Sequence, residues 1–151
     1  MTALTHAPSQ ILAKYLVDQA VFTDPAEMAE WPLFENLLPD DPSTVGVLAA
    51  AIYDSVGVKQ GRHMDGGNVF FPGLQIRMRS QRPPEAHTKA QLVEATLEAV
   101  KQTSVVVESS TYLLANVSQT GPLLFIGYEE FGRARRPLHT LNFLITVSQT
   151  S

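Results

Sequence analysis

The sequence predicts an α+β fold, in which helices pack on one face of a mostly antiparallel β-sheet. Residues Leu74 to Arg79 alternate apolar and polar side chains, which is the period of a half-buried strand. Residues Pro84 to Gln102 carry apolar side chains at spacings of three and four, which predicts an amphipathic helix. Later segments rich in β-branched and aromatic residues are predicted strands: Val105 to Val107, Tyr112 to Val117, Leu123 to Tyr128 and Leu138 to Val147. The 151 residues are expected to form a single domain.

The N-terminal part is predicted to contain one helix and one buried strand. Ser9 is the expected N-cap of the helix, and the Asp24-Pro25 step ends it, because proline disfavours helical geometry in the preceding residue. A connector with three prolines runs from Trp31 to Pro42. Residues Val47 to Tyr53 are interpreted as a strand, although their three alanines leave a helix possible. One face of the first helix is marked at helical spacing by Ile11, Leu12, Tyr15, Leu16, Gln19 and Ala20.

A long, irregular and flexible loop is predicted from Gly57 to Gly73, because this stretch contains five glycines and one proline. Loops of this length in a compact domain are usually functional or disordered. Val69, Phe70 and Phe71 lie at its end, and they either start a strand or form an apolar tip that packs against another subunit. Further along the chain, the last two strands are predicted to be joined by a charged turn, Tyr128 to Arg133.

The composition excludes several kinds of site and limits the partners. The chain has no cysteine, which excludes disulfides, thiolate metal sites and cysteine nucleophiles. Its net charge of −4 disfavours a general nucleic-acid binder. Residues 1–54 hold eight acidic residues and one basic residue, whereas residues 55–151 hold ten basic and seven acidic residues. This asymmetry is either ordinary scatter of surface charge or electrostatic complementarity between neighbouring copies.

The sequence carries no pattern that indicates catalysis, a cofactor or a metal. The four histidines form no H-E-x-x-H pair, and the serines form no G-x-S-x-G elbow. The glycines match no phosphate-binding motif. Adjacent carboxylates such as Glu129 and Glu130 are expected to diverge as solvated turn charges. No apolar run approaches the ~20 residues that span a bilayer, and the first ten residues do not resemble a secretory signal. We therefore expect neither an enzyme nor a membrane protein.

The arginines gather in two places. Arg77 and Arg79 share the polar face of one predicted strand, and Arg82 follows in the turn. Arg133, Arg135 and Arg136 lie between the last two strands. One interpretation is a solvated surface. The other is a protein interface, because arginine is enriched at interfaces and makes bidentate pairs with carboxylates, which the acidic N-terminal third of an adjacent subunit would supply.

Two segments together resemble a known family of phage proteins. GLQIRMRS (Gly73 to Ser80), followed by the amphipathic helix, resembles the middle of small bacteriophage minor capsid or tail-terminator proteins. GPLLFIGYEEFGR (Gly121 to Arg133), followed by Leu141-Asn142-Phe143, is similar to the closing pattern of that family. The resemblance covers about Val45 to Val147 and depends on the order and spacing of segments. The basic link Arg135-Arg136-Pro137 and a longer insertion, residues 61–71, depart from the family pattern.

The resemblance implies a terminator-like fold and an assembly role in the virion. Such proteins form a ring, usually a hexamer, on the head-proximal end of the tail tube of long, flexible-tailed phages. The ring stops polymerisation of the tail tube protein and presents its other face to a head-side neck or connector protein. DNA passes through the lumen without sequence-specific binding. The implied location is the tail or neck of the virion, with assembly in the host cytoplasm, and no cofactor or membrane is implied.

The candidate interface or lumen residues are charged and aromatic side chains from both arginine-containing regions. Reversal of Arg77 and Arg79 to glutamate is predicted to block ring assembly while the monomer stays folded. Two alternatives stay open: another head–tail neck component, such as a head-completion or connector protein, and a small-ligand-binding α+β domain. The candidate residues are Arg77, Arg79, Glu129, Glu130, Arg133, Arg135, Arg136, Phe70 and Phe71.

Overall fold

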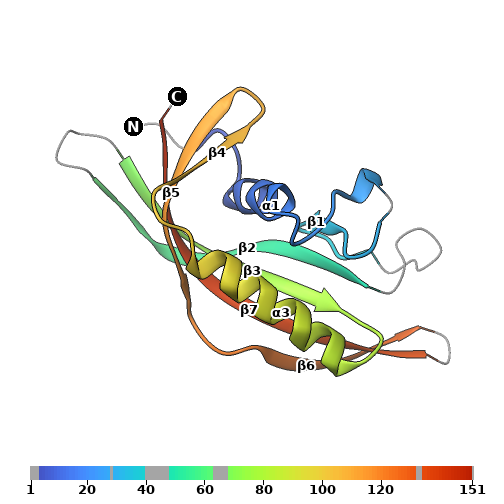
Figure 1. The fold of residues 1–151 in the computed structure, drawn as a ribbon. Helices are drawn as coiled ribbons and strands as arrows, with labels where there is room; N and C mark the ends of the chain where they lie inside the picture. The colour runs from blue at the N-terminus through green and yellow to red at the C-terminus, as the bar shows by residue number, and fades with distance from the viewer. Residues whose placement is uncertain (1–3, 28, 40–47, 63–67, 132–133, 151) are drawn as a thin grey trace.

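Two helices, α1 (Pro8–Asp18) and α3 (Pro83–Glu98), pack on one face of a seven-stranded sheet (Figure 1). The computed structural model describes residues 4–27, 29–39, 48–62, 68–131 and 134–150. This arrangement confirms the predicted α+β class. The strands are β1 (Leu33–Glu35), β2 (Ala49–Arg62), β3 (Asn68–Arg79), β4 (Thr103–Val107), β5 (Ser110–Gln119), β6 (Leu124–Phe131) and β7 (Ala134–Gln149), and a short 3-10 helix, η1 (Pro25–Glu27), precedes them.

The sheet is antiparallel except at one edge. Its strand order is β1-β2-β3-β7-β5-β4, and β1 pairs parallel to β2. β6 pairs with β7 on the side away from β3, since Thr140 of β7 is in register with both Arg77 of β3 and Leu124 of β6. β5 and β6 therefore follow one another along the same side of β7. Within the described part of the chain, β4 covers the outer side of β5, but no strand covers the outer side of β6.

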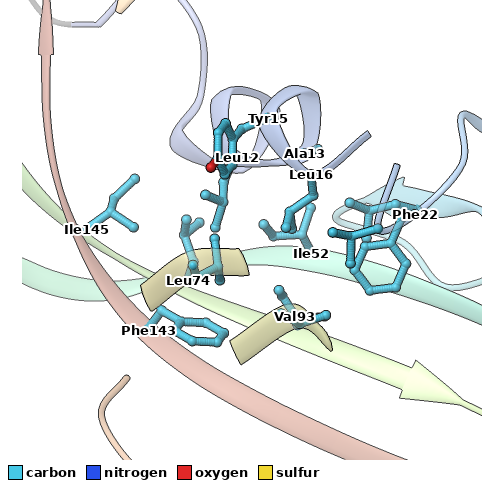
Figure 2. Close-up of a cluster of buried hydrophobic side chains, with 14 of the residues drawn as sticks. Leu12, Ala13, Tyr15, Leu16, Phe22, Ile52, Leu74, Val93, Phe143 and Ile145 are labelled. Atoms are coloured by element: carbon cyan, nitrogen blue, oxygen red, sulfur yellow. The ribbon is translucent and has the colours of Figure 1, made fainter. Parts of the chain in front are cut away.

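The core lies between the helices and one face of the sheet. Leu74, Ile76 and Met78 of β3 have no exposed surface and belong to one cluster with apolar residues of both helices. Figure 2 shows Val93 of α3 and Phe143 of β7 in this cluster. Because successive side chains of a strand point to opposite faces, the polar residues between these positions lie on the face that the helices leave open. We call it the open face.

The N-terminus of α1 is held by neighbouring residues. The Gln10 side chain accepts a hydrogen bond from the backbone N–H of Ala7 at 2.9 Å. The Asp54 carboxylate on β2 accepts from the backbone N–H of Ser9 at 2.9 Å and from its hydroxyl at 2.8 Å. Ser9 is thus inside the helix, and Ala7 occupies the cap position where the sequence predicted Ser9. A carboxylate at this place is favourable because it lies near the positive end of the helix dipole.

The segment from Gly57 to Gly73 is not the irregular loop that its glycine content predicted. β2 and β3 cover all of it except residues 63–67, which lie outside the described residues. The β2–β3 register shifts twice between Ser55 and Gly61, so Gly57 lies within the bulged part of the strand and Gly61 at its end. Glycine is common at bulges, and we attribute the wrong prediction to this use of glycine inside a strand.

Two other connections differ from prediction. β1 lies within the predicted connector from Trp31 to Pro42 and adds to the edge of the sheet beside β2. The predicted charged turn from Tyr128 to Arg133 is mostly strand, because β6 continues to Phe131 and pairs with the start of β7. Neither helix of the described chain is long and apolar enough to cross a membrane.

Candidate assembly interface

The arginine regions predicted from sequence meet at one end of the sheet. Arg79 on β3, Glu129 on β6 and Arg136 on β7 lie close together on the open face, where Glu129 is in register with Arg136. Arg79 Nη1 donates hydrogen bonds to Glu129 Oε2 at 3.3 Å and to the carbonyl oxygen of Pro39 at 2.6 Å. We call Arg79, Glu129 and Arg136 the buried arginine cluster.

The members of this cluster bind their own chain. Arg79 has no exposed surface, and Arg136 is 3% exposed. A glutamate at position 79 would bury a second carboxylate beside Glu129, which is costly because the like charges repel and the Pro39 carbonyl oxygen loses its donor. The sequence predicted that a double reversal of Arg77 and Arg79 leaves the monomer folded; because Arg79 is buried, we now expect the change at position 79 to destabilise the monomer. An interface role for Glu129 and Arg136 stays a prediction.

Arg77 has a different setting, two residues earlier on β3. Its guanidinium carbon lies 5.2 Å from the ring centroid of Tyr53, and Nη2 donates to Gln75 Oε1 at 3.4 Å. Gln75 Nε2 in turn donates to Asn142 Oδ1 at 3.2 Å. These half-buried side chains form a polar row across three strands of the open face. Arg77 is thus a partly exposed residue of the open face.

The remaining charged candidates lie on the β6–β7 hairpin. Arg135 Nη2 and Glu130 Oε1 are 3.8 Å apart, and their side chains are 69% and 73% exposed. An ion pair this open to water contributes little to stability. The Arg135 guanidinium also lies 5.7 Å from the ring centroid of Tyr128. Arg133 lies outside the described residues, so its predicted role has no structural account.

Phe70 and Phe71 form part of β3, which confirms the strand interpretation over the apolar tip. Phe70 is in register with Val147 of β7 and packs against the core, and Phe71 is in register with Val58 of β2. Both are partly buried. Their predicted interface role remains open, but Phe70 already has an intramolecular function.

Among the described residues, β6 carries four of the exposed large apolar side chains. Leu124, Phe125, Ile126 and Tyr128 are each about half exposed, with values from 46% to 52%. These apolar side chains point to both faces of β6, whose outer side has no partner strand in the described chain. Natural edge strands are normally protected by charge or proline, and the charges of β6, Glu129 and Glu130, lie beyond these residues. We call Leu124–Tyr128 the β6 edge.

The sequence predicted a strand at the β6 edge but did not single it out as an interface. The signal was present: Leu123 to Ile126 are apolar without alternation, although an edge strand with a solvated face should alternate. The β6–β7 register shifts between Phe125 and Gly127, and Gly127 has a φ of 123°. Ile126 is the extra residue of this bulge and needs no partner on β7. Its side chain can therefore point to solvent.

His139 lies beside the β6 edge, under the same side of the sheet as α3. Its ring centroid is 5.4 Å from that of Phe125, and the side chain is 6% exposed. Nδ1 has no hydrogen-bond partner in the described chain. Burial lowers the pKa of His139 below its ordinary value of 6.5, and the nearby His87 of α3 lowers it further.

This histidine predicts a loss of stability at acid pH. Below about 6.5 the unfolded chain binds a proton that folded His139 resists, so the free energy of unfolding falls as pH decreases from 6.5 toward the folded pKa. Above about pH 6.5 His139 is neutral in both the folded and the unfolded chain, so it causes no loss of stability there. Urea denaturation across this pH range should show the decline, and His139→Phe should flatten it. An unchanged decline in the variant would exclude His139 as its source.

A groove on the opposite end of the molecule is the place to consider for the small-ligand alternative. It has a volume of about 390 Å³ and lies between α1, β1 and the turn between β4 and β5. Asp24, Glu35 and Glu108 line it together with Lys14 and His6, so carboxylates outnumber bases. Within the described chain, no group of three or more His, Asp or Glu side chains is placed to hold a metal ion.

His6 joins this groove to the core. Its Nδ1 lies 2.6 Å from the hydroxyl of buried Tyr112, and Nε2 lies 3.3 Å from Glu108 Oε2. The Tyr112 hydroxyl also accepts from the backbone N–H of His6 at 2.9 Å. These bonds fasten the N-terminal segment to β5, which gives them a structural role.

The chain matches no protein-family model and no curated protein sequence. Its function is therefore argued from the surfaces described above.

Proposed function

We propose that this chain is a structural virion protein, a phage tail terminator that forms a ring on the head-proximal end of the tail tube. The ring contains six copies, the usual number in the family that the sequence resembles. One face binds the tail tube protein and halts its polymerisation. The other face receives the head-side connector protein, and DNA passes through the lumen without sequence-specific contacts.

The observation that carries this proposal is the β6 edge. About half of each large side chain from Leu124 to Tyr128 is in water, and the strand has no neighbour on its outer side in the described chain. Contiguous apolar surface of this kind marks protein interaction sites, and an unpaired edge is a template for pairing with another chain. The same residues lie in the segment Gly121 to Arg133, whose pattern resembles the tail terminators.

The two faces of the sheet differ in chemistry, and this favours a terminator over a subunit that repeats along the tail tube. Helices cover one face, and the open face carries the polar row of Gln75, Arg77 and Asn142. A subunit that stops a polymer must resemble the next ring on one side and reject it on the other. A molecule whose two faces differ in chemistry meets this requirement.

Polymerisation of the tail tube protein of the same phage, followed by electron microscopy, tests the proposal. Tubes formed with the chain should be shorter and should carry a ring at one end only. Tubes of unchanged length without end rings would contradict it. Binding of the chain to DNA-filled heads and not to tubes would instead assign it to another part of the neck, as the alternative from sequence expects.

A further inference from the structure

In the described part of the chain, β4 and β6 each have an open outer edge. β4, the last strand of the sheet order, has the sequence TSVVV, and the β6 edge has the sequence LFIGY. Within the described chain, β4 pairs with β5 alone and β6 pairs with β7 alone. Natural edges that must stay unpaired usually carry lysine, proline or an inward charge. β4 carries none of these, and the charges of β6, Glu129 and Glu130, come after the β6 edge. By contrast, the edge formed by β1 has three residues and ends in Glu35.

Both edges also expose apolar side chains. On β4 the side chain of Val106 is 51% exposed, and on the β6 edge that of Phe125 is 52% exposed. An aromatic side chain opposite a β-branched one is a favourable pair across neighbouring strands. Figure 1 places β4 and β6 at opposite ends of the molecule, so one chain cannot pair its own two edges. Each edge requires a second molecule.

We propose that the β6 edge of one copy pairs antiparallel with β4 of a second copy, so that one continuous sheet crosses the subunit boundary. This pairing rests on the proposed ring and names the contact that closes it. Because the two edges are different surfaces, the contact is head-to-tail, and repetition of such a contact gives a ring when the rotation closes. In the register that keeps the helices of both copies on one side of the sheet, Tyr128 lies opposite Thr103 of the second copy, and Phe125 lies opposite Val105, because Ile126 is the extra residue of the bulge.

The charges beside the two edges select the antiparallel direction. In this register Glu130, two residues beyond Tyr128, lies opposite Lys101 of the second copy, two residues before Thr103. Glu130 and Lys101 are both exposed. The parallel direction would instead bring Glu130 toward Glu108, the exposed residue that follows β4. Opposite charges across strands are favourable, and like charges are unfavourable.

Lysine substitutions at the centre of each edge test the pairing. Val106→Lys and Ile126→Lys place a charge on β4 and on the β6 edge, and both sites are about half exposed, so the monomers should stay folded. Leu92→Lys on α3 is the matched control, because Leu92 is 47% exposed and belongs to neither edge. By analytical ultracentrifugation, wild type and Leu92→Lys should form rings, and each edge variant should be a monomer with unchanged circular dichroism.

The outcomes separate this contact from the proposed function. Rings that persist in Val106→Lys or in Ile126→Lys would overturn the β6–β4 pairing while the tail-terminator proposal stands. Assembly lost in Ile126→Lys and kept in Val106→Lys would mean that the β6 edge pairs with some other surface, which also overturns it. Tail tubes that are not capped by wild type, despite rings lost in both edge variants, would contradict the proposed function and leave the pairing intact.

A charge exchange tests the direction of pairing. Glu130→Lys and Lys101→Glu should each weaken association, by up to about fivefold per contact, because each puts like charges opposite one another. A mixture of the two variants should recover rings in which they alternate, since opposite charges then face each other again at every boundary. Recovery in the mixture supports an intermolecular antiparallel contact. No recovery in the mixture would exclude this register.

Discussion

Arg79→Met is expected to lower the free energy of unfolding by about 3–5 kcal/mol, the cost of removing one partner from a buried ion pair. The Arg79 side chain has no exposed surface and bonds to the Glu129 carboxylate and to the Pro39 carbonyl oxygen. Methionine fills similar space without donating hydrogen bonds, so both acceptors lose a charged donor. Urea denaturation followed by circular dichroism measures the change.

Arg77→Met is the control for this prediction, because Arg77 lies on the same strand and the same face but is only half-buried. Its loss should cost about 1 kcal/mol or less. Equal effects of the two substitutions would mean that Arg79 is a surface residue, as the sequence first suggested. The comparison therefore tests whether the backbone at Pro39 covers Arg79 on the open face.

Phe143→Ala is expected to cost about 3–5 kcal/mol, because the residue is 2% exposed and lies in the main core cluster on β7. β7 pairs with β3, β5 and β6, so a cavity here cannot close without shifting several strands. Figure 2 shows its ring beneath the helices, near Val93 and Leu74. The loss is measurable by urea or thermal denaturation.

Leu144→Ala changes the next residue of β7, on the other face of the strand. It tests whether only the helix-covered face of β7 is packed. Leu144 is half-buried and faces away from the helices. Its truncation should cost about 1 kcal/mol. If Leu144→Ala were as destabilising as Phe143→Ala, both faces of β7 would be packed, and the open face proposed for assembly would not exist in the monomer.

Local pattern was sufficient to predict the class of the fold. The alternation from Leu74 to Arg79 and the stripe of the central helix are properties of consecutive residues, and both elements formed where expected. Helix α3 ends at Glu98, shorter than the Gln102 expected. β1 was missed because it has only three residues and lies between prolines. Its only strand partner among the described residues is β2, and the start of β2 at Ala49 is sixteen positions after Leu33.

The candidate site was only partly predictable for a similar reason. Arg79 is one of the polar residues that alternate with apolar ones along its strand, and this pattern predicts an exposed side chain. In the structure, the backbone at Pro39, distant in sequence, buries it. Sequence spacing does not report which distant loop crosses a strand. The pairing of Glu129 with Arg136 likewise depends on the hairpin register and not on the acidic and basic runs themselves. Exposure of the β6 edge follows from the sheet order, which no local pattern determines.

Native mass spectrometry of the purified wild-type chain, alongside Ile126→Lys, tests most directly whether this protein acts through ordered self-assembly. We expect one closed wild-type species of six 16.5 kDa chains and a monomeric variant. A wild-type chain that stays monomeric at every soluble concentration, with or without the tail tube protein, would contradict ordered self-assembly.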